Sequence, residues 1–150
     1  MTQNSKLVKR SNMEKTLVLI KPDAVERGLN GEIISRFERA GLKVIALKML
    51  HLSKDMARKH YAVHAGKSFY DELVRYISSS TIVAMVLQGD NAIEVARKLM
   101  GSTDPAKAAK GTIRGDFGQD ISRNSVHGSD SPQTAETEIK LFFSGLEIFD

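Results

Sequence analysis

The chain has 150 residues, a formal net charge of +4 and no cysteine, so disulfides and thiolate chemistry are excluded. Residues 1–12 contain three basic residues and no acidic one, which leaves +1 of that charge for residues 13–150. A body this close to neutral argues against binding to nucleic acid through overall charge.

No apolar run approaches the ~20 residues that a membrane span needs. Residues 1–12 also lack the apolar core of a secretory signal. We therefore expect a cytoplasmic protein with no membrane attachment. Residues 1–12 would be a polar extension, and residues 13–150 would form one domain.

The first third of the domain predicts a strand–helix–strand unit. Residues 16–20 are continuously apolar and branched, which is typical of a buried strand, and Pro22 ends it. Apolar residues recur at helical spacing over 32–40, and Gly41 is a suitable residue just beyond the helix end. Residues 43–50 predict the second strand.

The middle of the chain predicts three helices and one strand. Ser53 is a good N-cap for a short helix, and Asp90 is an equally good one for a later helix. The apolar run 82–87 predicts the third buried strand. The expected helices are 53–61, 69–77 and 91–100.

Residues 101–123 are interrupted by four glycines and a proline and predict no regular element. A loop this long in a compact domain indicates either a regular element that was missed or a functional segment, and we expect a functional segment. A short last strand ending at His127 and a helix over 132–143, with Pro132 in its first position, would follow. The apolar tail residues after 143 should dock on the body.

Alternating strands and helices of this kind predict an α/β or α+β sandwich with one sheet. The pattern alone leaves strand order and direction open.

His127 lies in the stretch that carries the clearest chemical signal. Histidine can be neutral, and therefore nucleophilic, at physiological pH. Gly128 leaves room beside the ring, and the hydroxyl of Ser129 and the following helix start can hold an anion. The stretch predicts a histidine that accepts and donates a phosphoryl group.

Such a histidine needs cations for the phosphate, and Lys21, Arg97 and Arg114 are the candidates. Lys21 follows the first strand, where ligands of open sheets gather. Lys21 is equally compatible with a solvated side chain at a strand end, and either arginine taken alone is more often a surface residue.

The imidazole also needs a group that orients it. Glu138 on the last helix, helped by Ser129, is the candidate, with Glu136 as a competitor. Further candidates are Phe69 for stacking on a base, Tyr61 as a hydrogen-bonding group, and the polar loop residues Thr103 and Asn124. His60 and His64 are interpreted as solvated helix-end residues rather than a metal pair.

Together these residues resemble the nucleoside diphosphate kinase family over about residues 13 to 143. The matching segments are 16–25 (TLVLIKPDAV), 31–38 (GEIISRFE), 101–105 (GSTDP), 111–117 (GTIRGDF) and 124–131 (NSVHGSDS). The resemblance implies an α+β, ferredoxin-like βαββαβ fold with a four-stranded antiparallel sheet and flanking helices. It also implies ping-pong transfer of the γ-phosphoryl group of ATP to nucleoside diphosphates.

The resemblance assigns roles within the site. His127 would attack through Nδ1 with Glu138 and Ser129 in support, and Asn124 would contact the ribose together with Lys21. Phe69 would stack on the base, with Ile121 on its other face. The phosphates would be held by Lys21, Arg97, Thr103 and Arg114.

The resemblance further implies Mg²⁺ carried on the nucleotide phosphates, with no direct protein ligand. Residues 101–117 would shape the contacts of a homo-oligomer, a hexamer or a tetramer, and no nucleic acid is required. Two other functions stay open from the residues alone. They are a nucleotide- or nucleic-acid-binding regulator that retains the fold, and a hydrolase that uses His127 as a base.

Overall fold

A single antiparallel sheet runs through the molecule. The computed structural model describes residues 13–150, and the extension predicted for residues 1–12 lies outside them. The strands pair in the order β2-β3-β1-β4. They are β1 (Met13–Ile20), β2 (Lys43–Leu50), β3 (Ile82–Asp90) and β4 (Val126–Gly128).

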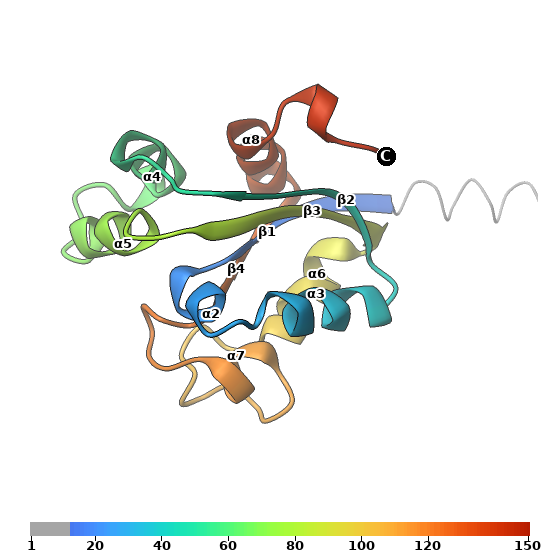
Figure 1. The fold of residues 1–150 in the computed structure, drawn as a ribbon, viewed down its shortest axis with the longest axis horizontal. Helices are drawn as coiled ribbons and strands as arrows, with labels where there is room; N and C mark the ends of the chain where they lie inside the picture. Colours follow the sequence, from blue (N-terminus) through green and yellow to red (C-terminus); the bar gives the residue numbers. More distant parts are fainter. Residues whose placement is uncertain (1–12) are drawn as a thin grey trace, which may run out of the picture.

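Helices cover both faces of the sheet (Figure 1). One face carries α4 (Lys54–His60), α5 (Tyr70–Ile77) and α8 (Pro132–Phe142). The other carries α2 (Pro22–Glu26), α3 (Asn30–Arg39), α6 (Ala92–Met100) and α7 (Ile113–Phe117). Two short 3₁₀ turns, η1 (Ala62–His64) and η2 (Gly145–Glu147), complete the described elements. The predicted α+β sandwich with a four-stranded antiparallel sheet is confirmed.

The apolar run in β1 is continuous because helices pack on both faces of the sheet. Successive strand residues point to opposite faces, so Leu17 and Leu19 enter the core under α4, α5 and α8. Val18 and Ile20 enter the core under α2, α3 and α6. Both sets are buried, and no polar alternation is left for a solvent face.

The short edge strand β4 places the candidate nucleophile. His127 pairs with Leu19 of β1. Because directly paired residues share a face, the His127 side chain lies on the α4 and α8 side of the sheet. The sheet register therefore decides which helices can supply partners for its ring.

Three predicted helix boundaries are confirmed. The Ser53 side chain accepts a hydrogen bond from the Met56 backbone N–H at the start of α4. Pro132 occupies the first turn of α8, which Ser131 caps. Gly41 follows α3 with φ +90°, a conformation that favours glycine.

Two predictions were wrong. Asp90 is the last residue of β3 and does not cap a helix. The N-cap of α6 is Asn91, whose backbone is in the left-handed region and whose side chain makes no capping hydrogen bond. Glu14 of β1 instead accepts a hydrogen bond from the Ile93 N–H at 3.3 Å. Residues 101–123 also contain the one-turn helix α7, whose N-cap is Thr112. A single turn that includes a glycine is too short to produce a recognisable apolar period.

The tail docks only in part. The Phe149 backbone N–H donates to the Ile45 carbonyl of β2 at 2.8 Å and Ile148 packs against the core, but the Leu146 and Phe149 side chains are exposed, contrary to the prediction. Within residues 13–150, no helix combines the length and the apolar character required to cross a membrane.

Replacing Phe37 with alanine should lower the free energy of unfolding by about 3–5 kcal/mol. Phe37 is fully buried between α3 and the sheet, so truncation leaves a cavity. Arg39→Ala on the exposed side of the same helix is the control and should change stability by less than about 0.5 kcal/mol. Denaturant unfolding monitored by circular dichroism measures both, and equal effects would contradict this view of α3.

Candidate active site around His127

The predicted orienting groups lie where the sequence placed them. The Nε2 atom of His127 is 2.6 Å from Oε2 of Glu138 on α8. The Ser129 hydroxyl donates to the other carboxylate oxygen at 2.7 Å and accepts from the Leu17 N–H at 3.2 Å. The competitor Glu136 instead pairs with Lys140 in solvent. One carboxylate is thus held at both oxygens.

This arrangement determines which ring nitrogen of His127 can react. Burial acts to raise the pKa of Glu138, but the hydrogen bond and charge of His127, together with Ser129, outweigh it and lower this pKa. A carboxylate accepts only, so the His127 proton belongs on Nε2. Nδ1 then carries the lone pair, and the His127 side chain is 24% exposed.

His60 departs from its predicted place. The sequence suggested a solvated helix end, whereas the His60 side chain is 1% exposed and its Nδ1 lies 3.4 Å from Glu138 Oε2. Its ring packs edge-on against His127 with centroids 4.6 Å apart. The signal was available, because His60 follows the buried Ala57 by three residues and so shares its helical face.

The structure therefore contains a cluster of possible metal ligands that was not predicted from the sequence. Within residues 13–150, His60, His127 and Glu138 each offer a metal-ligating atom, and these atoms lie within 4.8 Å of one another. His60 was expected to be solvated, and it joins His127 and Glu138 instead, because α4 and α8 meet over β4 only in three dimensions.

Lys21 lies in a second polar group beside this one. Its ammonium donates to Asn124 Oδ1 at 2.9 Å, and Asn124 Nδ2 donates to the Thr103 carbonyl at 3.0 Å. Burial, with the charge of Arg114 next in importance, lowers the pKa of Lys21 to about 8. Three predicted residues from distant segments are thereby joined.

Arg114 lies on α7, and two backbone carbonyls outside that helix hold its side chain in place. Its guanidinium donates to Gly101 and to Val126, each at 2.9 Å, and its Nε is buried with no partner. Burial and the charge of Arg97 lower the pKa of Arg114 to about 10, so it stays cationic at neutral pH. Arg97 itself is exposed on α6.

The three remaining predicted residues differ in their burial. Tyr61 is buried against the His60 ring, and burial, followed by the charge of Glu138, raises the pKa of its hydroxyl. Phe69 is 44% exposed and packs edge-on against His64, while Ile121 is 60% exposed. Such exposed apolar side chains are free to contact a ligand.

A network that the sequence reading missed supports the segment before His127. Asp23 is buried on α2, and its carboxylate accepts from Tyr76 at 2.6 Å and from Ser125 at 3.1 Å. Ser125 has φ +72°, and its carbonyl accepts from the Lys21 N–H at 2.8 Å. The network ties α5 and α2 to the residue two positions before the candidate nucleophile.

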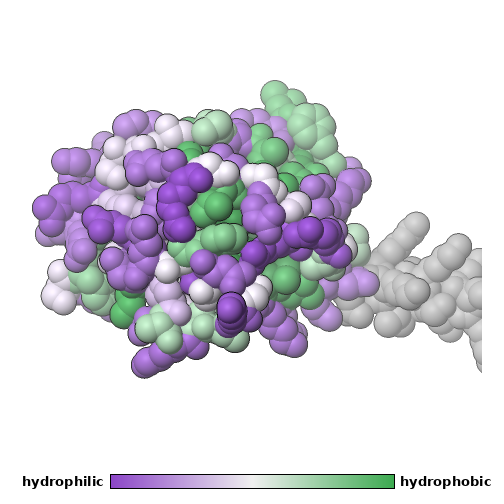
Figure 2. All heavy atoms as spheres, turned by 60° about the horizontal axis from the view of Figure 1, so that its bottom comes forward, coloured by the Kyte–Doolittle hydropathy of each residue, from purple (hydrophilic) through white to green (hydrophobic). Residues whose placement is uncertain are grey.

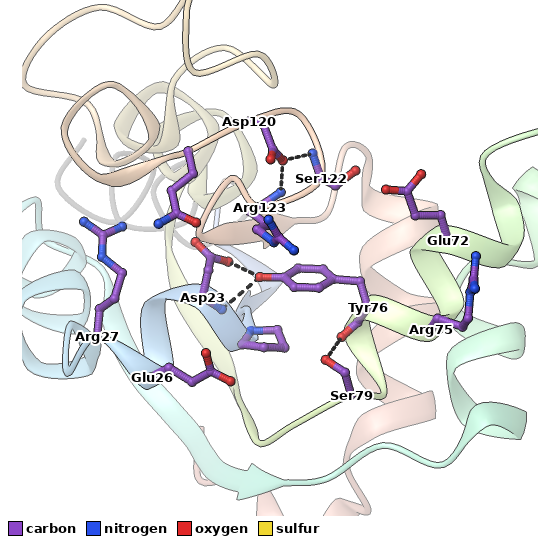
Figure 3. Close-up of a pocket in the computed structure, with 12 residues that line it drawn as sticks. Asp23, Glu26, Arg27, Glu72, Arg75, Tyr76, Ser79, Asp120, Ser122 and Arg123 are labelled. Atoms are coloured by element: carbon purple, nitrogen blue, oxygen red, sulfur yellow. Dashed lines mark hydrogen bonds between the residues drawn. The ribbon is translucent and has the colours of Figure 1, made fainter.

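Figure 3 shows the Tyr76 hydroxyl in contact with Asp23, and both residues line a cavity of about 700 Å³. Arg27, Arg75 and Arg123 also line this cavity. None of the described side chains that line it is one of the predicted site residues.

Residues 14–148 match the sequence model of the family described as nucleoside diphosphate kinase. The chain belongs to the nucleoside diphosphate kinase family. A nucleoside diphosphate kinase of Archaeoglobus fulgidus is 60% identical over 136 residues, which cover 91% of this chain and 90% of that protein. One from Pelotomaculum thermopropionicum is 56% identical over 138 residues, 92% and 93% of the two chains.

Solved nucleoside diphosphate kinase structures share the fold. The Aquifex aeolicus enzyme has a TM-score of 0.89 at 44% identity, covering 91% of this chain and 99% of that one. The Halobacterium salinarum enzyme, determined in complex with CDP, has a TM-score of 0.89 at 46% identity, covering 91% of both chains. The family is therefore evident at the level of sequence and of structure.

Tyr76→Phe tests the Asp23 network of this nucleoside diphosphate kinase. Removing the hydroxyl deprives the buried carboxylate of a donor and should lower the free energy of unfolding by about 1–3 kcal/mol. Tyr70→Phe is the matched control, because its hydroxyl makes only a 3.4 Å contact with the Arg58 carbonyl near the surface. Equal denaturation midpoints for the two variants would contradict a supporting role for Tyr76.

Proposed function

We propose that this protein transfers the γ-phosphoryl group of ATP, or another nucleoside triphosphate, to nucleoside and deoxynucleoside diphosphates through a phosphohistidine on His127. The carrying observation is the 2.6 Å contact between His127 Nε2 and Glu138. It directs the ring so that Nδ1 is the nucleophile. Membership in the nucleoside diphosphate kinase family agrees with this chemistry.

In the first half-reaction, Nδ1 of His127 attacks the γ-phosphorus. A nitrogen–phosphorus bond forms while the bond to the bridging oxygen breaks, and the nucleoside diphosphate leaves with that oxygen. The phosphorylated ring keeps its Nε2 proton and gains positive charge, which the Glu138 carboxylate stabilises. In the second half-reaction a terminal phosphate oxygen of the acceptor attacks the same phosphorus and frees Nδ1.

The cations around His127 would neutralise the transferring group. Lys21, Arg97, Thr103 and Arg114 are the proposed phosphate-binding residues. Supporting this, Lys21 and Arg114 are buried and cationic at neutral pH, and the Arg114 Nε lacks a partner within the chain. A dry, preorganised cation stabilises developing charge more effectively than a solvated one.

The nucleoside would occupy the exposed apolar side of the site. Phe69 is proposed to stack on the base with Ile121 on its other face, and Asn124 to contact the ribose together with Lys21. Tyr61, whose hydroxyl stays protonated, would act as a hydrogen-bond donor in the site. Stacking accepts every base, which suits a broad nucleotide specificity.

Mg²⁺ is the proposed metal, bound with the nucleotide rather than by protein ligands. It prefers oxygen ligands and often binds through substrate phosphates. Among residues 13–150, the one cluster of three candidate ligands includes two imidazoles, a donor set poorly suited to Mg²⁺. When bound, the ion supplies charge neutralisation on the phosphate oxygens.

We further propose a cytoplasmic homo-oligomer, a hexamer or tetramer, whose contacts include residues 101–117. Hydrophobic atoms gather at the centre of the face that carries α3, α6 and α7, and hydrophilic atoms surround them (Figure 2). Edge strand β2 also exposes Leu47 and Met49. Exposed apolar patches commonly mark protein contacts, and sedimentation analysis measures the stoichiometry.

His127→Ala should abolish both the covalent intermediate and the exchange reaction. The wild-type chain should gain the mass of one phosphoryl group on incubation with ATP, in a linkage that is acid-labile and alkali-stable. The variant should gain none, and GTP formation from ATP and GDP should fall on the order of 10⁴-fold or more. His51→Ala, distant in sequence and exposed, is the control.

The same assay separates the alternatives. A regulator that only binds nucleotide or nucleic acid would form no GTP. A hydrolase would release inorganic phosphate without needing GDP. Retention of the phosphoryl label in His127→Ala would overturn the proposal.

The logarithm of kcat/KM should fall as pH rises through about 8. The lowered pKa of Lys21 means that the free enzyme loses this positive charge above that pH, and phosphate attraction with it. The decline approaches about tenfold per pH unit. Lys21→Gln should have a low kcat/KM near neutral pH and lack this decline; an unchanged decline in the variant would assign it to another group.

A further inference from the structure

His60 has no role in the proposed phosphoryl transfer, although its side chain is buried beside His127 and Glu138. His60 has two buried ring nitrogens, and neither has a hydrogen-bond partner among the described residues. Its side chain is 1% exposed. Buried polar atoms are rarely left unpaired, so two on one ring call for an explanation.

The surroundings keep this ring neutral. Burial, followed by the charge of His127, lowers the pKa of His60 to about 3. A neutral imidazole has a free lone pair on one nitrogen, which is the form that binds metals. The neighbouring Glu138 is ionised, because its pKa is lowered.

We propose that His60, His127 and Glu138 form a binding site for a borderline divalent transition-metal ion of the Zn²⁺ class. Two imidazole nitrogens and one carboxylate oxygen, with a fourth position open, are a donor set that Zn²⁺ takes in proteins. Mg²⁺ prefers oxygen ligands and is disfavoured here.

The two contacts with Glu138 require little adjustment, whereas the two imidazoles, whose ligand atoms lie within 4.8 Å of each other, must move closer together. Zinc–ligand bonds of about 2.0–2.2 Å in a tetrahedron place neighbouring ligand atoms about 3.3 Å apart. His60 Nδ1 and Glu138 Oε2 are already 3.4 Å apart. The His127–Glu138 contact of 2.6 Å would widen by less than about 1 Å, and Ser129 would still hold the other carboxylate oxygen in place.

Occupation of this site would switch the enzyme off through the tautomer of His127. A metal takes the Nε2 lone pair, so the single proton of the neutral ring must move from Nε2 to Nδ1 through solvent. Nδ1 then has no lone pair with which to attack phosphorus. This inhibition rests on the proposed function, whereas metal binding itself does not.

Binding is measured on the full chain without nucleotide, by zinc competition against a chromogenic indicator and by the visible spectrum of the Co²⁺-substituted protein. The wild type should bind one ion per chain with a tetrahedral Co²⁺ spectrum, and excess Mg²⁺ should not displace it. His60→Gln should weaken zinc binding by at least about tenfold, because it deletes a ligand.

His51→Gln is the matched control, because that histidine is exposed and its Nε2 contacts only the Ser78 carbonyl, at 2.7 Å. It should bind zinc as the wild type does. Glu138→Gln provides a second loss-of-ligand variant that leaves the His60 pocket intact. Circular dichroism establishes that each variant is folded, and if His60→Gln does not fold, Glu138→Gln carries the test.

The second measurement is phosphoryl transfer at saturating Mg²⁺ and ATP. Zinc should inhibit the wild type and His51→Gln, a chelator should restore activity, and His60→Gln should require at least about tenfold more zinc. Equal zinc affinity in the wild type and the folded ligand variants would overturn the site. Tight binding without inhibition would overturn the tautomer mechanism and leave the proposed function untouched.

Discussion

The hydrogen bond between His127 and Glu138 is the interaction on which the rest of the site depends. It assigns the ring proton to Nε2, leaves the lone pair on Nδ1 and keeps a carboxylate charged inside the protein. That carboxylate is stable there because Ser129 and His127 satisfy both of its oxygens. An unpaired charge at the same depth would be neutralised by a shift of its pKa.

Sheet geometry makes this hydrogen bond possible. β4 is only three residues long, yet its pairing with β1 turns His127 toward α4 and α8 and turns Gly128 toward α6. A Cβ at Gly128 would lie 2.5 Å from the terminal methyl of Met100, so a larger residue here would require the Met100 side chain to move. The chain just before β4 is fixed by Ser125, which has a left-handed backbone conformation and donates a hydrogen bond to the Asp23 carboxylate.

His60 shows how one carboxylate can serve two arrangements. In the structure, Glu138 Oε2 is hydrogen-bonded to His127. The neutral ring of His60 lies nearby, with its Nδ1 3.4 Å from the same oxygen. Catalysis and metal binding place opposite demands on the proton of His127. Because the two states share the same oxygen, they exclude each other, and this exclusion follows from the number of protons on a neutral imidazole.

The sequence by itself determined the strands, most of the helices and the chemistry around His127. The apolar runs of β1 and β3, the caps Ser53 and Ser131 and the glycines that end helices are local signals, and so is the motif around His127. Tertiary structure alone decided the environment of side chains whose partners are remote in the chain. His60 was read as solvated, and α7 and the Asp23 network went unseen, because burial and buried hydrogen bonds arise only where separate elements pack together. The physical reason is that the periodicity of a sequence indicates which face of a helix is apolar. Which other element packs against that face depends on the tertiary structure.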